Sequence, residues 1–241
     1  MLNYHSIETF GAHEGPGLRL VIFLQGCQFK CLYCHNPDTI ECKKNKEISG
    51  DEIIKRLENG REYYFPKGGI TFSGGEPTLQ SSEILSVFKK AKKLGFNTCL
   101  DSNGAILNDS TKKLLEYTDL VLLDVKHIDN KKHKILTGAS NKQTLKTAEY
   151  LEKNNIKMWL RYVLVPEFSD DINDVKKWCE HFRNYKNIEK AEILPYHALG
   201  EHKYEELSWE YKLKNIKPPT PEKISEVEKI FQKYFKKVVV R

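Results

Sequence analysis

Three cysteines lie within eight residues of the chain, at Cys27, Cys31 and Cys34. Their C-x3-C-x2-C spacing lets one loop wrap three thiolates around a single soft metal centre. Two centres fit: a [4Fe–4S] cluster that keeps one iron free of protein thiolate, or a structural zinc completed by His35, Cys42 or a distant ligand. Zinc sites more often use paired C-x2-C units, and the chain has no such pair, so the spacing favours the cluster.

Five short polar runs elsewhere in the chain are of a kind that suits ligand binding. Each run follows a segment rich in β-branched or other apolar residues, and the runs are 25–27, 73–77, 101–104, 124–126 and 195–197. One such run alone would be an ordinary turn, whereas five in succession are hard to explain as turns. Because active sites of parallel α/β folds lie at the carboxyl ends of the strands, we expect the runs to meet at one mouth.

The strands and helices that must position these runs alternate along the chain. Strands are expected at 18–24, 69–72, 97–100, 120–123, 157–164 and 191–194, with 238–240 as a candidate for a last strand. Helix start signals open segments near residues 81, 108, 170 and 220, and the charged segment 42–64 is expected to be partly helical. Alternation of this kind implies parallel pairing through right-handed crossovers. It predicts one α/β domain, either doubly wound or a barrel of about six units where a closed barrel has eight.

The composition is that of a globular protein. The 241 residues carry 39 Lys and Arg against 33 Asp and Glu, a formal net charge of +6, and 39% of them are hydrophobic. These values exclude a disordered chain, and no apolar run approaches the ~20 residues that span a bilayer. Residues 1–10 lack the layout of a signal peptide, so we expect a cytoplasmic protein without a membrane partner. The lysines are spread over helix-like stretches, which argues against a nucleic-acid partner.

The cysteine loop, with an aromatic residue before its last cysteine, resembles the radical S-adenosylmethionine (SAM) superfamily. The block 14–19 leading into 25–27, followed by 33–37, makes the chain similar to the activating enzymes of glycyl radical enzymes. The likeness covers almost the full length through the further segments 98–104, 122–126, 161–166, 194–200 and 217–219. The cysteine loop identifies only the superfamily, whereas the later segments indicate the narrower family.

The resemblance implies a fold, a reaction and partners. The fold would be a partial (β/α)6 TIM-like barrel of the radical SAM type, in a single domain over 1–241 with short terminal extensions. The reaction would be reductive cleavage of SAM at a [4Fe–4S] cluster, followed by hydrogen abstraction from a glycine of a partner enzyme in anaerobic metabolism. The chain lacks a cysteine-rich insertion between its first two strands, which favours pyruvate formate-lyase as that partner. The electron donor would be of the flavodoxin or ferredoxin type.

The resemblance also assigns site residues one by one. Cys27, Cys31 and Cys34 are implied to ligate the cluster. The residues implied to bind SAM come from most of the motifs: Tyr33, Cys34, His35, Gly74, Gly75, Asp124, Val125, Lys126, Arg161 and His197. Glycines suit this role because a backbone without Cβ can approach a ligand closely. Asp101 and Asp124 are implied to hold a monovalent cation, Na+ or K+, and their oxygens suit such a hard ion.

Taken singly, several of these residues have ordinary alternative explanations. These are core packing for Tyr33 and His197, a surface loop for His35, a surface salt bridge for Lys126, and helix N-capping for Asp101 and Asp124. The remaining cysteines, Cys42, Cys99 and Cys179, match no ligand role, and we expect them to be buried thiols. Two rival functions also stay open: a radical SAM enzyme for a small molecule, and a non-catalytic iron–sulfur or zinc module.

Overall fold

The computed structural model describes all 241 residues and divides them into two compact units. The first unit consists of Met1–Cys27 and Thr39–Leu122, and the second of Gln28–Asp38 and Leu123–Arg241. The short 3-10 helix η1 (Pro37–Thr39) and the strand β6 (Leu120–Asp124) each cross the boundary between them. The expectation of a single domain over 1–241 stays a prediction. No helix in the protein is long and apolar enough to cross a membrane.

The first unit contains a five-stranded part of the sheet in the order β3-β1-β2-β4-β5. Strands β2 (Arg19–Leu24), β4 (Gly69–Gly74) and β5 (Asn97–Ser102) pair in parallel, and β1 (Leu2–Gly11) pairs antiparallel with β2 and with β3 (Lys46–Ile48). The parallel strands are buried almost throughout, as expected for strands covered on both faces.

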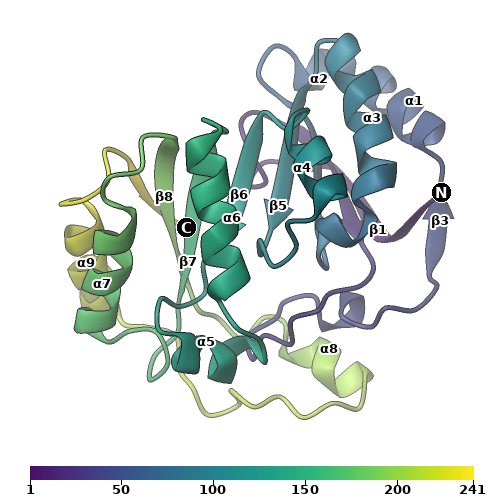
Figure 1. Ribbon diagram of the computed structural model, residues 1–241. Coiled ribbons are helices and arrows are strands. Elements are labelled where there is room, and N and C mark those ends of the chain that lie inside the picture. Colours follow the sequence, from purple (N-terminus) through teal and green to yellow (C-terminus); the bar gives the residue numbers. More distant parts are fainter. The chain divides into compact units, whose positions relative to one another are not determined.

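Helices cover this sheet because their apolar residues fall on one face. The helix α3 (Ser81–Lys93) buries Ile84, Val87, Phe88 and Ala91 at the i, i+3, i+4, i+7 spacing of an amphipathic helix. Its flanking neighbours are α1 (Gly50–Asn59) and α4 (Asp109–Leu115) (Figure 1). The short helices α2 (Arg61–Tyr64) and η2 (Pro77–Gln80) complete the unit.

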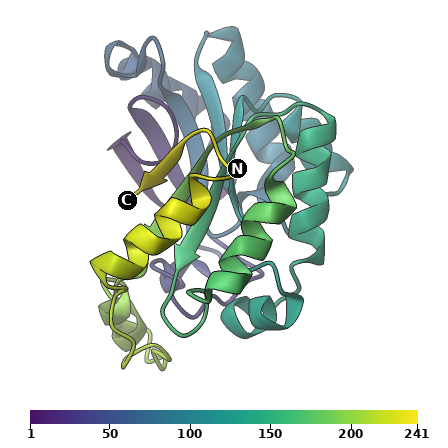
Figure 2. The same cartoon turned by 90° about the vertical axis from the view of Figure 1, so that its left-hand side faces the viewer.

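The second unit contains the parallel strands β7 (Met158–Leu164), β8 (Ile188–Pro195) and β9 (Val238–Val240). The helices α7 (Ile172–Phe182) and α9 (Pro221–Phe231) pack side by side (Figure 2). Trp178 of α7 fixes this packing, because its ring stacks on Phe231 at 5.2 Å and meets Tyr162 of β7 edge-on at 5.3 Å. The other helices are α5 (Asn130–Thr137), α6 (Lys142–Lys153) and α8 (Glu201–Glu206).

All six predicted strands and the candidate last strand are present, with ends that shift by at most three residues. The predicted alternation with helices is also correct. The sequence did not indicate β1, because this strand alternates polar and apolar residues irregularly and forms through its pairing with β2. The segment 42–64 holds α1 and α2, as expected, and also the unexpected edge strand β3.

Candidate active site

Cys27 lies just beyond the carboxyl end of β2, in a turn fixed by backbone hydrogen bonds. The Cys27 N–H donates to the carbonyl of Ile40 at 3.0 Å, and the Gly26 N–H donates to Thr39 at 2.8 Å. The Cys27 sulfur accepts a contact from the Asn103 side-chain amide at 3.7 Å. A donor of this kind favours a thiolate over a thiol, so Asn103 would support Cys27 if Cys27 is the metal ligand that the sequence predicts. The sequence placed Asn103 in a motif without giving it this role.

Gly74, the last residue of β4, and Gly75, which follows it, are required to be glycines by close packing of backbone against backbone. A Cβ on Gly75 would lie 2.1 Å from the Gly26 carbonyl oxygen, and Gly74 adopts a φ of 97°. The Gly75 N–H donates to Leu24 at 2.9 Å, so the turn after β4 is bound to the end of β2. The glycines therefore hold the turn that carries Cys27, and their approach to SAM stays a prediction.

A buried carboxylate ties the turn after β4 to the end of β5. Glu76 is fully buried and accepts from the Ser102 hydroxyl at 2.7 Å, the Asn103 N–H at 2.8 Å and the Thr78 N–H at 3.0 Å. Burial raises the pKa of Glu76, and these donors oppose that effect. Since Asn103 contacts Cys27, Glu76 positions the neighbour of a predicted cluster ligand. The sequence signalled Glu76 only as part of a Gly-Gly-Glu turn.

The two aspartates assigned to a cation lie in different units. Asp101 is the last but one residue of β5 in the first unit and accepts from the Ser73 hydroxyl at 2.7 Å, whereas Asp124 is the last residue of β6 and belongs to the second unit. The capping alternative is wrong for both, because Asn108 caps α4 and Asp129 caps α5. The cation site stays a prediction.

In the second unit, Asp124, Lys126 and Tyr33 lie close together: Tyr33 is buried, and the side chains of Lys126 and Asp124 are 12% and 18% exposed. The Lys126 ammonium lies 2.9 Å from Asp124 Oδ2 and 5.6 Å from the centre of the Tyr33 ring. Burial alone would lower the pKa of Lys126, but the attraction of Asp124 raises it overall, so the ammonium stays charged. The Lys126 salt bridge exists, as the alternative explanation predicted, but it is only partly exposed to solvent and does not lie openly on the surface.

His35 and His197 stack on each other beside the last cysteine. Their ring centres are 4.2 Å apart, and His35 Nε2 donates to the His197 carbonyl at 3.2 Å. Burial, and then the nearby charge of His197, lowers the pKa of His35, so His35 is neutral at pH 7. Gly200 packs against this pair, because a Cβ there would lie 3.0 Å from His35 Cα. Tyr33 lies in the core, as its alternative explanation predicted, but its hydroxyl has no partner.

Arg161 lies on β7 and is held by a neighbour that the sequence did not indicate. Its Nε donates to Glu192 of β8 at 3.0 Å, and Glu192 also pairs with Lys190 at 2.6 Å and Arg241 at 2.9 Å. Burial raises the pKa of Glu192, but the three cations outweigh it and lower the pKa overall. The Arg161 carbonyl accepts from the Val125 N–H at 3.3 Å, which links β7 to the segment that carries Lys126.

Three buried polar atoms around these side chains have no hydrogen-bond partner: Tyr33 OH, Asp124 Oδ1 and His197 Nδ1. Buried polar groups normally have hydrogen-bond partners. Three such groups without a partner, at strand and loop ends of one unit, indicate a site where a polar molecule can bind. An amino acid group and a nucleoside, as in SAM, offer ammonium, carboxylate, hydroxyl and base nitrogens to such atoms. The residues present therefore fit SAM.

The cysteines also fit a cluster by chemistry, although their geometry does not demonstrate one. All six cysteines are free thiols, and the Cys34 N–H donates to the Cys31 carbonyl at 3.1 Å in a tight turn. Within neither unit do three His, Cys, Asp or Glu side chains lie close enough together to hold a metal ion. The prediction that Cys27, Cys31 and Cys34 bind a cluster is therefore based on their spacing in the sequence. Cys99 and Cys179 are buried as expected, but the expectation for Cys42 was wrong because this thiol is exposed.

Comparison with known proteins gives this arrangement a class. The sequence profile of the Radical SAM superfamily matches residues 21–179, a range that begins within β2, includes the cysteine loop and ends within α7. SuiB of Streptococcus suis, solved with the precursor peptide SuiA, aligns with a TM-score of 0.70 at 18% identity, over 98% of this chain and 50% of that one. These matches confirm the predicted fold class, an α/β fold of the radical SAM type.

Closer relatives narrow the class. Pyruvate formate-lyase 1-activating enzyme of Escherichia coli (strain K12) is 42% identical over 238 residues, covering 98% of this chain and 97% of that protein. Pyruvate formate-lyase-activating enzyme of Staphylococcus epidermidis is 44% identical over 230 residues, covering 92% of each chain. This chain belongs to the family of the pyruvate formate-lyase-activating enzymes, and it is a radical SAM enzyme.

Proposed function

We propose that this protein activates pyruvate formate-lyase by taking a hydrogen atom from one of its backbone glycines under anaerobic conditions. The observation that carries the proposal is the 42% identity, over 98% of the chain, to an E. coli protein named for that activation. The substrate is then a glycine loop of a folded protein. The small-molecule alternative and the non-catalytic module lack a comparable observation.

The cofactors of this reaction are a [4Fe–4S] cluster and SAM, which when bound supply the electron and the 5′-deoxyadenosyl radical. Cys27, Cys31 and Cys34 would hold the cluster as thiolates, since three ligands leave one iron open to SAM. Asn103 would stabilise the charge on Cys27 through the amide that lies 3.7 Å from its sulfur.

The chain's own side chains would bind and orient SAM. Lys126 and Arg161 would neutralise its carboxylate, the first as a point charge and the second through a planar fork. Asp124 Oδ1 would accept from its ammonium group or, together with Asp101, hold Na+ or K+ beside it.

The remaining contacts would enclose the two ends of SAM. Stacked His35 and His197, with Tyr33, would form the adenosine side and keep water out, and backbone groups of Cys34 and Val125 would contribute there. Gly74 and Gly75 would admit the methionine end.

A separate protein would deliver the electron, and we propose a carrier of the flavodoxin or ferredoxin type. The site of action would be the cytoplasm, which keeps thiols reduced, and six free cysteines are consistent with that. The proposal includes no nucleic-acid or membrane partner.

The test follows the hydrogen atom. The reconstituted protein is mixed anaerobically with SAM, dithionite and a peptide from the glycine loop of pyruvate formate-lyase that carries deuterium at the glycine α-carbon. We expect deuterium in the 5′-deoxyadenosine, at a slow rate because a flexible peptide must lose conformational entropy on binding. Retention of all deuterium on the peptide and on the intact partner enzyme, together with turnover of a metabolite, would establish the small-molecule alternative.

A further inference from the structure

The C-terminal end of α5 carries part of the cysteine loop. The Lys30 N–H donates to the Thr137 carbonyl at 2.8 Å, and the Leu32 N–H donates to Leu136 at 2.9 Å. These two bonds occupy carbonyls that the end of a helix would otherwise leave unsatisfied. Because Lys30 and Leu32 flank Cys31, the backbone of this predicted cluster ligand is attached directly to the last turn of α5.

The outer face of α5 is exposed, and it ends near the last turn of the helix, where the cysteine loop is bound. Lys131, Lys134, Ile135 and Gly138 follow the i, i+3, i+4, i+7 spacing of one helix face, and all four are exposed. Ile135 is 61% exposed, which is unusual for a large apolar side chain between charged ones. Gly138 lies next to Lys30, since a Cβ on it would stand 4.0 Å from Lys30 Cβ. We call Lys30, Lys131, Lys134 and Ile135 the α5 face.

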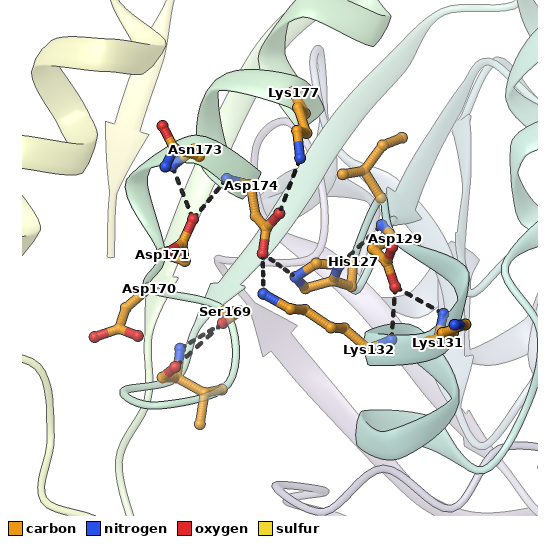
Figure 3. Close-up of polar contacts among 12 residues, drawn as sticks. His127, Asp129, Lys131, Lys132, Ser169, Asp170, Asp171, Asn173, Asp174 and Lys177 are labelled. Carbon is orange, nitrogen blue, oxygen red and sulfur yellow. Dashed lines mark hydrogen bonds and ion pairs between the residues drawn. The ribbon is translucent and has the colours of Figure 1, made fainter.

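A neighbouring lysine of α5 does not belong to this face. Figure 3 shows Asp129 capping α5 through the N–H groups of Lys131 and Lys132, at 2.8 and 2.9 Å. The same view shows the side chain of Lys132 reaching to Asp174 of α7, with which it forms an ion pair. The charge of Lys132 is therefore offset within the protein, whereas the lysines of the α5 face project into solvent.

The charges on the two helices that contact the cysteine loop differ in sign. The helix α5 has three lysines and no acidic residue. On the other hand α8, whose Tyr204 hydroxyl donates to the Cys31 carbonyl at 3.4 Å, has three glutamates and one lysine, Lys203, which pairs with Asp38. A negatively charged partner that must come close to Cys31 is thus attracted to α5 and repelled by α8.

We propose that the α5 face is the docking surface for an acidic, one-electron carrier protein of the flavodoxin type. The inference rests on the proposed function, which needs one electron from outside for each SAM cleaved. Ile135 would pack on the apolar dimethylbenzene edge of the carrier's flavin, and Lys30, Lys131 and Lys134 would pair with carboxylates around it. A small interface with an apolar centre and a charged rim is typical of transient electron-transfer complexes.

The electron balance of the step is simple. The carrier's reduced flavin loses one electron, and a cluster in the [4Fe–4S]2+ state gains it and becomes [4Fe–4S]1+. No covalent bond of this chain forms or breaks. The role of the α5 face is to hold the flavin edge next to Cys31 while the electron passes.

The test compares Lys134→Glu, and the double variant Lys131→Glu/Lys134→Glu, with the control Lys229→Glu. Both Lys134 and Lys229 are exposed and lie in the last turn of a helix in the second unit. Lys134→Glu and the control Lys229→Glu therefore carry the same penalty from the helix dipole. Calorimetry measures the Kd of a reduced acidic flavodoxin at low and high salt. Stopped-flow absorbance measures cluster reduction by that flavodoxin and, separately, by dithionite.

We expect the double variant to bind flavodoxin about tenfold more weakly at low salt and to lose most of the salt dependence, because two attractive charges become repulsive. Reduction by flavodoxin slows accordingly, whereas reduction by dithionite and the behaviour of Lys229→Glu do not change. Ile135→Ser is expected to weaken binding at every salt concentration, because its contribution is apolar.

Three results would overturn the inference, and they are distinguishable. An unchanged flavodoxin Kd in the double variant places the carrier elsewhere. Unchanged flavodoxin binding with slower glycyl radical formation under dithionite makes the α5 face a surface for the substrate enzyme. If the unmodified protein does not cleave SAM with dithionite, the proposed function itself is contradicted, and no electron carrier is needed.

Discussion

Single polar contacts decide how the candidate ligands are held. Asn103 contacts the sulfur of Cys27, and Glu192 holds Arg161, although the sequence pattern assigned neither residue such a role. Both act on a neighbour, one through an amide donor and the other through a buried carboxylate. Their contributions can be separated by measurements that do not depend on turnover.

Replacing Asn103 with Ala is expected to shift the reduction potential of the cluster to more negative values. An N–H donor to a ligating sulfur stabilises the reduced, more negative cluster, so removing it disfavours reduction. An EPR-monitored redox titration measures the potential, and iron content should stay unchanged. Asn97→Ala is the control, because Asn97 contacts Cys99, which is not a predicted ligand. A potential equal to that of the unmodified protein would show that the 3.7 Å contact does not act on the cluster.

Replacing Glu192 with Gln is expected to lower the free energy of unfolding by about 3–5 kcal/mol. The change leaves Arg161 and Lys190 buried without their shared carboxylate, and an uncompensated buried charge is costly. Glu189→Gln on the same strand is the matched control, since Glu189 is exposed and its pair with Lys157 should contribute at most about 1 kcal/mol. Urea denaturation measures both. Equal losses in the two variants would contradict the role assigned to the buried carboxylate.

Helices and strands position the loops that carry the predicted ligands, and α5 is the clearest example. Its outer face is the proposed docking surface, its last turn binds the cysteine loop, and its inner face carries His133. His133 is fully buried, its Nδ1 donates to the Ala139 carbonyl at 2.8 Å, and its ring lies 5.5 Å from that of Phe29 in the cysteine loop. The ring of His133 thus packs α5 directly against the cysteine loop.

The protein is expected to lose stability in mild acid, partly through His133. Burial lowers the pKa of His133 below its ordinary value of 6.5, with Lys126 and His127 adding to the effect. The unfolded chain then takes up a proton near pH 6.5 that the folded chain does not, so stability is complete above pH 6.5 and falls as the pH is lowered through that value. The loss is at most about 1.4 kcal/mol per pH unit for this histidine.

Urea denaturation between pH 7.5 and 5.5 measures this slope. His133→Asn retains a donor for Ala139 but does not titrate, so its curve should be flatter even though its stability is lower throughout. Exposed His202→Asn serves as the control. If His133→Asn and the unmodified protein lose stability in parallel, His133 does not contribute to the acid sensitivity.

For the protein as a whole, binding of SAM is expected to raise the free energy of unfolding. A ligand that binds only the folded protein at about 100 times its Kd adds ~2.7 kcal/mol, which raises the Tm of a chain of this size by several degrees. The unpartnered Asp124 Oδ1 is the atom that the ligand or its cation would satisfy. Asp124→Ala is therefore expected to need a higher SAM concentration for the same rise, at unchanged iron content.

Differential scanning fluorimetry under anaerobic conditions measures the rise, in sodium and in potassium salts. A dependence on the identity of the salt would support the proposed cation held by Asp101 and Asp124. Asp109→Ala, at an exposed position of α4, is the control. Equal SAM responses in Asp124→Ala and in the unmodified protein, with no effect of the salt, would remove Asp124 from both roles.

The sequence by itself determined the strand pattern, the fold class and the family. Parallel strands buried on both faces are short apolar runs, so β2, β4, β6 and β7 could be located within a few residues. The cysteine spacing is likewise local, because one loop must supply three ligands. By contrast β1 and β3 were missed, since the irregular pattern of β1 and the short edge strand β3 depend on pairing more than on their own residues.

The residues that hold the predicted site residues in place could be identified only from the folded structure. Glu76, Asn103 and Glu192 gain their roles from partners 26 to 76 positions away along the chain, and no local pattern encodes such distances. Gly74 and Gly75 were predicted for ligand approach, but the structure shows that close backbone packing already requires them, Gly74 against Leu24 and Gly75 against Gly26. The sequence thus indicates what chemistry the side chains can perform, because residue types and spacing are local. Which of them are buried, charged and held in place follows from long-range contacts that form only when the chain folds.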